Sequence, residues 1–227
     1  MIDPKKLLYV SDLDGTLLDG DGQLSEDSVK RINMLIDKGL NFTIATARNY
    51  DSAYPLLKRL NLKYPVILFN GVYLTDLHSG ENLFLSNFIS LDIISKMISL
   101  AEAQKVAPFI YTYGRKHLVY YKEVNNLGAK SYVDIISSDQ RAHKVNEFIF
   151  SDSDQITGFL LIDVSEVLEP IYTELITLYK DALNIYFAPD VSNPNFFWLQ
   201  CFHLGANKGK MLKKMTEYLD ISLSNTV

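Results

Sequence analysis

The chain has 227 residues, of which 48% are hydrophobic, and its formal net charge is -5. This length and apolar content are enough to bury a substantial core in one large domain or two small ones. Proteins that bind nucleic acids usually carry an excess of basic residues, and this chain has an excess of acidic ones. We therefore expect no nucleic-acid partner.

The single cysteine and the absence of long apolar runs argue against a disulfide-bonded, secreted or membrane-spanning protein. Cys201 is the only cysteine, which rules out an intramolecular disulfide and is typical of a reducing compartment. The amino-terminal sequence "MIDPKKLLYVSDLDG" has only four consecutive apolar residues after its charged pair, too few for a signal peptide. No apolar run approaches the roughly 18 residues of a membrane span. We therefore expect a cytoplasmic protein with no membrane partner.

Strands and helices alternate in the first third of the chain. The apolar run at 7–10 is typical of a strand covered on both faces, and Ser25 and Gly39 are a typical helix cap and stop. The pattern predicts strands at 7–10, 41–47 and 65–71 and helices at 25–39 and 50–62, with Pro55 tolerated only near the first turn of its helix. Such alternation predicts right-handed crossovers and a parallel sheet.

From about residue 83 the regular alternation of strands and helices gives way to a hairpin pattern and mixed elements, which predicts a second, mixed domain. Residues 109–121 are typical of an antiparallel hairpin that turns at Gly114-Arg115. Further strands are predicted at 156–164, 183–190 and 196–202 and helices at 91–105, 167–181 and 206–220. The predicted fold class is α/β, with a Rossmann-like parallel sheet core at 1–82 and 196–227 and an inserted α+β domain at 83–195.

Polar residues follow successive strands at the edge where parallel sheets bind ligands. Asp12, Thr46 and Asn70 stand at the carboxyl ends of the three predicted strands. Asp12 and Asp14 can share a divalent cation or divide nucleophile and acid/base roles. Gly15 frees the backbone to turn amides toward an anion. An ordinary Asp-Gly turn explains the two carboxylates about equally well, and Asn-Gly is also a common turn pair.

Lys208 has an argument of its own. A cation in the first turn of a helix opposes the helix dipole by several tenths of a kcal/mol, so a structural role explains this placement poorly. An ammonium aimed at a phosphoryl group and at Asp12 explains it better. Against this, three more lysines on the same predicted helix also fit a solvated basic face: Lys210, Lys213 and Lys214.

Four segments together resemble a known family. The sequence "DLDGTLL" at 12–18 resembles the first motif of the haloacid dehalogenase superfamily, "IATAR" at 44–48 the second, and "GANKGKML" at 205–212 the third. The "FNG" at 69–71 and the insertion between the second and third motifs resemble the Cof-type subfamily, whose large cap domain is inserted there. The resemblance implies a Mg²⁺-dependent phosphatase.

The resemblance also implies roles for individual residues. Asp12 would attack phosphorus and form an aspartyl-phosphate, and Asp14 would protonate the leaving oxygen and then activate water. Asp12 and the backbone carbonyl of Asp14 would hold Mg²⁺, and Lys208 would complete the catalytic set. The implied phosphate- and substrate-binding residues are Gly15, Thr46, Ala47, Arg48 and Asn70. For Arg48, substrate binding and an ion pair with an acidic neighbour are equally compatible with the sequence.

One feature of the family has no counterpart in this sequence. The fourth motif, a Gly-Asp pair with another Asp shortly after it, would follow the helix that carries Lys208, but "YLDISLSNTV" contains no such pair. Family sheets place the next strand beside the first one, so we expect the edge at 7–10 to be uncovered, or covered by another copy in a homo-oligomer. We also expect weak metal binding and low turnover.

The predicted function is hydrolysis of a small phosphorylated metabolite such as a sugar phosphate. Two alternatives remain open: a protein that binds a phosphate ligand or regulates without catalysis, and a phosphomutase on the same core. In the inserted domain, Tyr111, Tyr113 and Arg115 are possible substrate contacts, although tyrosines paired across a solvent-facing hairpin explain them equally well.

Overall fold

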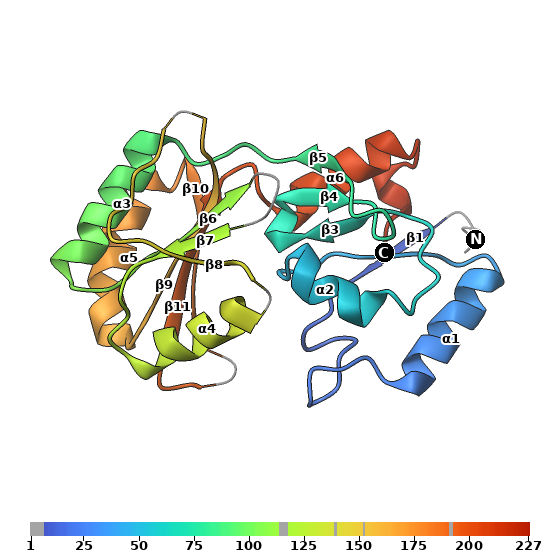
Figure 1. Ribbon diagram of the computed structural model, residues 1–227. Coiled ribbons are helices and arrows are strands. Elements are labelled where there is room, and N and C mark those ends of the chain that lie inside the picture. The colour runs from blue at the N-terminus through green and yellow to red at the C-terminus, as the bar shows by residue number, and fades with distance from the viewer. Residues whose placement is uncertain (1–6, 114–117, 139, 152, 191–192) are drawn as a thin grey trace. The chain divides into compact units, whose positions relative to one another are not determined.

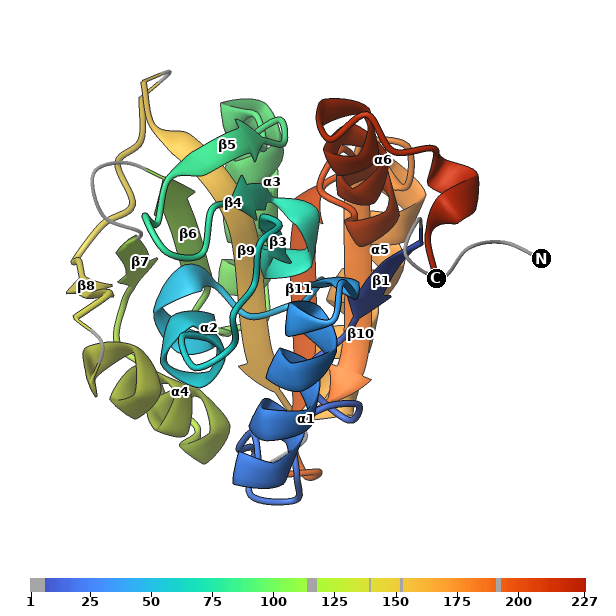
Figure 2. The same cartoon turned by 90° about the vertical axis from the view of Figure 1, so that its right-hand side faces the viewer.

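The computed structural model describes residues 7–113, 118–138, 140–151, 153–190 and 193–227 (Figures 1 and 2). It divides into two compact units, each described below by itself. The first unit comprises the residues up to Ser86 together with Ala206–Val227, and the second comprises Asn87–Gly205. Within the described residues, no helix is both long and apolar enough to cross a membrane.

The first unit has a core of parallel strands. In chain order its elements are β1 (Leu8–Ser11), α1 (Glu26–Asp37), β2 (Asn41–Ile44), α2 (Tyr50–Leu57), β3 (Val66–Leu68), the 3₁₀ turn η2 (Phe69–Gly71), β4 (Tyr73–Thr75), β5 (Asn82–Leu85), α6 (Lys208–Tyr218) and the 3₁₀ turn η3 (Leu223–Asn225). β1 pairs with β2 in parallel, and a parallel bridge joins Ala45 to Ile67 at the start of β3. The predicted α/β class with a parallel core is therefore confirmed.

Helix α6 packs on one face of these strands. Its buried Met211 and Met215 share a core cluster with Leu8, Ala45 and Ile67. Helices α1 and α2 lie away from α6 in both views, with strands of this unit between them (Figures 1 and 2). The continuous apolar runs of β1 and β3 follow from this arrangement, because a strand covered on both faces needs apolar residues on both.

The free edge of β1 is not bare, which corrects the expectation of an uncovered edge. Thr226 forms a parallel bridge with Leu8. The amide of Val227 donates to the carbonyl of Leu8 at 2.9 Å, and the amide of Val10 donates to the carbonyl of Val227 at 2.8 Å. The last two residues of the chain therefore pair with β1 on the side opposite β2, as the resemblance implied for the next strand.

The predicted strand at 65–71 ends earlier than its composition indicates. β3 stops at Leu68, and the next three residues form η2. Strand β4 then pairs antiparallel with β3, and β5 with β4. The sequence left an Asn-Gly turn open at this point, but β4 was not predicted. Pro55 is also not in the first turn, since α2 begins at Tyr50 and Pro55 is its sixth residue.

In its described residues the second unit is a six-stranded sheet with three helices. Its elements are α3 (Leu91–Ala103), β6 (Phe109–Tyr113), β7 (Leu118–Tyr121), α4 (Leu127–Ser138), β8 (Ala142–Lys144), β9 (Gln155–Asp163), α5 (Ser165–Tyr179), β10 (Leu183–Pro189) and β11 (Phe197–His203). The strand order is β10-β11-β9-β6-β7-β8, antiparallel except for the parallel pair of β7 and β8. The unit is therefore mixed α and β, as its pattern of strand and helix segments predicted.

Both faces of this sheet are covered. Helices α3 and α5 lie on one face (Figure 1), where Ile94 and Leu168 share a buried cluster with Ile110 of β6. Helix α4 packs from the other side, where the ring of Tyr132 meets that of Phe109 edge to face at 4.9 Å. Neighbouring residues of β6 thus point to opposite faces, as the pleat of a strand requires.

The boundary between the two units falls at other residues than the sequence indicated. β11 was assigned to the core at 196–227, but it pairs with β9 and β10 in the second unit. β5 pairs with β4, so the first unit extends to Ser86 rather than residue 82. An apolar run predicts a strand but not the sheet that it joins. The expected hairpin turn at Gly114-Arg115 lies outside the described residues.

A helix cap provides a test of local stability in the first unit. The hydroxyl of Ser25 accepts a hydrogen bond from the amide of Ser28 at 3.1 Å at the start of α1. We expect Ser25→Ala to lower the free energy of unfolding by about 1 kcal/mol in urea titrations, because a helix amide loses its partner. Ser90 precedes α3 without a side-chain cap bond, so Ser90→Ala is the control and should change stability by less than about 0.5 kcal/mol. Equal losses in both variants would contradict this assignment.

Candidate active site

The two aspartates occupy the turn that follows β1. The carbonyl of the fully buried Leu13 accepts hydrogen bonds from the amides of Thr16 and Leu17, at 3.2 and 2.9 Å. Gly15 has φ +71°, which favours glycine, and a side chain there would meet open space. A buried leucine thus fixes the turn while Asp12 and Asp14 on either side remain exposed.

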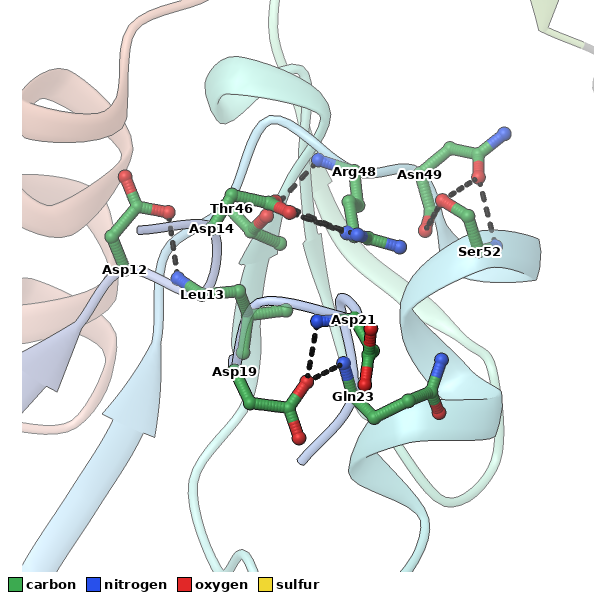
Figure 3. A network of polar contacts seen from close by, with 10 residues as sticks. All are labelled: Asp12, Leu13, Asp14, Asp19, Asp21, Gln23, Thr46, Arg48, Asn49 and Ser52. Atoms are coloured by element: carbon green, nitrogen blue, oxygen red, sulfur yellow. Dashed lines mark hydrogen bonds and ion pairs between the residues drawn. The ribbon is translucent and has the colours of Figure 1, made fainter. Parts of the chain in front are cut away.

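The two carboxylates point in different directions (Figure 3). Asp12 points toward α6, where its Oδ2 lies 2.6 Å from the Nζ of Lys208. Its Oδ1 accepts a hydrogen bond from the amide of Leu13 at 2.7 Å. The sequence separates Asp12 and Lys208 by almost the whole chain, and the structure brings them into an ion pair. The expectation that this lysine faces Asp12 is therefore consistent with the geometry.

Asp14 instead makes a forked ion pair with Arg48. The Nη2 of Arg48 lies 2.8 Å from Oδ1 of Asp14, and its Nε lies 3.2 and 3.0 Å from the two oxygens. Such paired contacts fix the orientation of a carboxylate as well as its position. The sequence left open whether Arg48 binds substrate or an acidic neighbour, and in this structure it binds Asp14.

Thr46 lies at the end of β2 and is fully buried. Its hydroxyl oxygen accepts a hydrogen bond from the amide of Arg48 at 3.1 Å, and its own amide donates to the carbonyl of Ile67 at 2.9 Å. The hydroxyl still has its proton to donate. Ala47 follows as an exposed residue of the same loop. One of these hydrogen bonds ties the loop to β3, and the other closes it on itself.

Asn70 belongs to η2, next to the loop that carries Thr46. Its amide donates to the carbonyl of Thr46 at 3.1 Å, and its backbone is left-handed with φ 55° and ψ 26°. On the other side of the turn, Gly71 lies directly against the backbone of Asn207 and Lys208. The candidate residues of the first unit thus come from three strand ends and one helix start, joined in pairs by the contacts described above.

Helix α6 starts at Lys208, and Asn207 is its cap. The side-chain oxygen of Asn207 accepts hydrogen bonds from the amides of Gly209 and Lys210, at 2.9 and 3.2 Å. The helix predicted at 206–220 includes Asn207, for which the sequence indicated no role. Asn207 stands three residues before Lys210, which is the spacing of an N-cap and the amide that it binds. The cap could therefore have been predicted from the sequence.

The oxygens of this site are of the kind that binds magnesium. Carboxylate and carbonyl oxygens from Asp12 and Asp14 are hard ligands, and Mg²⁺ keeps several waters beside one or two carboxylates. Each oxygen of Asp12 already accepts one hydrogen bond but has a second lone pair. Within the described ranges, no three His, Cys, Asp or Glu residues gather as a possible metal site. The ligand type therefore fits, with two protein groups to hold the ion.

Comparison with known families agrees with these motifs. Residues 9–227 match the family described as haloacid dehalogenase-like hydrolase. The chain belongs to this family. Because the match covers both the strand that ends at the aspartates and the helix that starts at Lys208, it includes every candidate residue of the site. The chain is therefore an enzyme of a hydrolase family.

Individual relatives are phosphatases in name. The chain is 23% identical to 5-amino-6-(5-phospho-D-ribitylamino)uracil phosphatase YitU of Bacillus subtilis, across 97% of this chain and 78% of that protein. It is 35% identical to pyridoxal phosphate phosphatase YbhA of Escherichia coli over 68 residues, which are 30% of this chain and 25% of that protein.

A solved structure shares the fold. A haloacid dehalogenase-like hydrolase from Bacteroides thetaiotaomicron superimposes with a TM-score of 0.76 at 17% identity, across 97% of this chain and 79% of that one. At this identity the likeness shows the fold alone.

The ion pair of Asp12 and Lys208 should contribute little to stability. Their side chains are 44% and 32% exposed, and exposed pairs typically contribute about 0 to 1 kcal/mol. We expect Lys208→Met to change the free energy of unfolding by less than about 1 kcal/mol, measured in urea. Lys213→Met on the same helix is the control. A much larger loss for Lys208→Met alone would show that the lysine holds the fold together rather than serving chemistry.

Proposed function

We propose that this protein is a Mg²⁺-dependent phosphatase that hydrolyses a small phosphorylated metabolite through an aspartyl-phosphate at Asp12. The observation that carries the proposal is the 2.6 Å contact between the Asp12 carboxylate and the Lys208 ammonium. A partly exposed cation held beside an exposed carboxylate is placed to neutralise the charge of a phosphoryl group as it approaches that carboxylate. The names of the phosphatase relatives support the same chemistry.

The first step is displacement at phosphorus. A carboxylate oxygen of Asp12 forms a bond to phosphorus, and the bond from phosphorus to the leaving oxygen breaks. That oxygen takes a proton from Asp14, which becomes a carboxylate. In the second step Asp14 takes a proton from water, the water oxygen attacks phosphorus, and inorganic phosphate leaves Asp12. Protons and charges therefore balance over the cycle.

Arg48 controls the position of Asp14 in this scheme. As a carboxylate, Asp14 accepts the forked contacts of Arg48, and this is the form that takes a proton from water. As a neutral acid it attracts the guanidinium less, so the pair loosens while Asp14 donates to the leaving oxygen. Thr46 supplies a buried hydroxyl at the same loop, suited to a phosphoryl oxygen. Bound Mg²⁺ would supply charge neutralisation between phosphate and Asp12.

The direct test is phosphate release with a panel of esters. The panel contains p-nitrophenyl phosphate, sugar phosphates, pyridoxal 5′-phosphate and 5-amino-6-(5-phospho-D-ribitylamino)uracil, each assayed with and without Mg²⁺. We expect release only with Mg²⁺, and release at the background level for Asp12→Asn, because the amide lacks the attacking oxygen anion. Release that is unchanged in Asp12→Asn would refute the assignment.

Removal of the metal gives a separate prediction. We expect EDTA to abolish release and added Mg²⁺ to restore it, while the midpoint of thermal unfolding moves little, because the described residues offer the ion just two protein groups, from Asp12 and Asp14. Release that survives EDTA would contradict the role of the metal.

The small number of carboxylates also supports a second candidate, a protein that binds a phosphate ligand without turning it over. Within the described residues Asp12 and Asp14 have no third acidic or histidine neighbour at a metal-binding distance. This candidate predicts that inorganic phosphate or a sugar phosphate raises the thermal midpoint, with no product formed at any Mg²⁺ concentration. Transfer of phosphate between two sugar phosphates, rather than release to water, would instead indicate a mutase.

A further inference from the structure

Three consecutive residues of the first unit have left-handed backbones. The φ angles of Phe69, Asn70 and Gly71 are +51°, +55° and +89°. Glycine adopts this conformation readily and asparagine tolerates it, but for a bulky residue such as phenylalanine it is an outlier. Such conformations persist only where surrounding contacts hold them, and they concentrate at functional sites. The contacts of this turn therefore indicate what it is for.

On one side the turn holds the loop that follows β2. The amide of Phe69 donates to the carbonyl of Arg48 at 2.8 Å, and the amide of Asn70 donates to the carbonyl of Thr46 at 3.1 Å. Both bonds use backbone groups that the left-handed turn directs back toward the loop. The side chain of Arg48 in turn forms an ion pair with Asp14. The turn thus fixes the backbone from which Asp14 is positioned.

On the other side the turn meets the start of α6. A Cβ added to Gly71 would lie 2.4 Å from the carbonyl carbon of Asn207 and 2.8 Å from the amide nitrogen of Lys208. These atoms belong to the peptide bond that leads into the helix, so they cannot move without moving Lys208. Only a residue without a side chain permits this approach. The contact therefore sets how close the backbone of Lys208 comes to the turn.

We propose that the turn Phe69–Gly71 is a positioning element that ties the Thr46–Arg48 loop to the start of α6, and that Gly71 sets the distance between the Lys208 ammonium and Asp12. The turn acts on the two carboxylates through Arg48 and Lys208. Only the kinetic part of this inference rests on the proposed function, because the distance between Asp12 and Lys208 is a property of the protein without substrate.

Gly71→Ala tests the inference with a matched control. Gly22 has φ +69°, and a Cβ added there would meet open space, so Gly22→Ala introduces the same backbone strain without a collision. In Gly71→Ala we expect kcat with p-nitrophenyl phosphate to fall about 10²-fold, the effect of misplacing a group by about 1 Å, with KM changed less than about twofold. Gly22→Ala should keep the kcat of the parent protein. An equal kcat in both variants would overturn the proposal.

A crystal structure of Gly71→Ala gives a readout that does not depend on activity. We expect the Asp12 to Lys208 contact, 2.6 Å in the parent protein, to lengthen beyond the roughly 4 Å limit of an ion pair. An unchanged contact would overturn the proposal. If the parent protein releases no phosphate, the proposed function fails, while this distance still decides whether Gly71 positions Lys208.

A second pair of variants decides the question if Gly71→Ala does not fold. Asn207→Gly removes the cap and loosens the peptide between Gly71 and Lys208, and Ser25→Gly makes the same change at α1. Both should fold, because glycine is tolerated at a helix cap. We expect kcat to fall at least about tenfold in Asn207→Gly and to stay constant in Ser25→Gly. Full activity of Asn207→Gly would refute the proposal.

Discussion

The parallel pairing of β1 with β2, continued by the bridge to β3, is the constraint on which the site depends. Parallel strands end at the same edge of a sheet, so residues that follow them in the sequence meet in space. Asp12, Thr46 and Asn70 come from three separate strand ends for this reason. Helix α6 adds Lys208 because Met211 and Met215 bury its apolar face on the same strands. The core and the chemistry therefore share one set of contacts.

The site consists of two separate ion pairs that point in different directions, rather than one cluster of charges. Lys208 holds Asp12 and Arg48 holds Asp14, and the two carboxylates diverge (Figure 3). Two neighbouring carboxylates can have different functions only if their surroundings differ. A point-charge lysine beside Asp12 and a forked arginine beside Asp14 provide such a difference. This separation is the physical basis for assigning attack to one aspartate and proton transfer to the other.

Much of the fold was predictable because local sequence patterns determine it. The apolar runs predicted the buried strands, and the polar residues after them placed Asp12, Thr46 and Asn70 at strand ends on one edge of the sheet. Three features were not predictable, because each depends on contacts between distant segments. The sequence did not reveal that Arg48 binds Asp14, that β11 joins the sheet of the second unit, or that Phe69 itself adopts a left-handed backbone before the Asn-Gly pair.

The most direct test of the central claim is chemical capture of the intermediate. The protein is mixed with Mg²⁺ and a phosphate ester that it hydrolyses. The reaction is quenched in acid within milliseconds, and the protein is digested and analysed by mass spectrometry. We expect one added phosphoryl group on the peptide that contains Asp12, and its disappearance as turnover completes. Turnover with no modified peptide, or with the phosphoryl group on another residue, would contradict nucleophilic attack by Asp12.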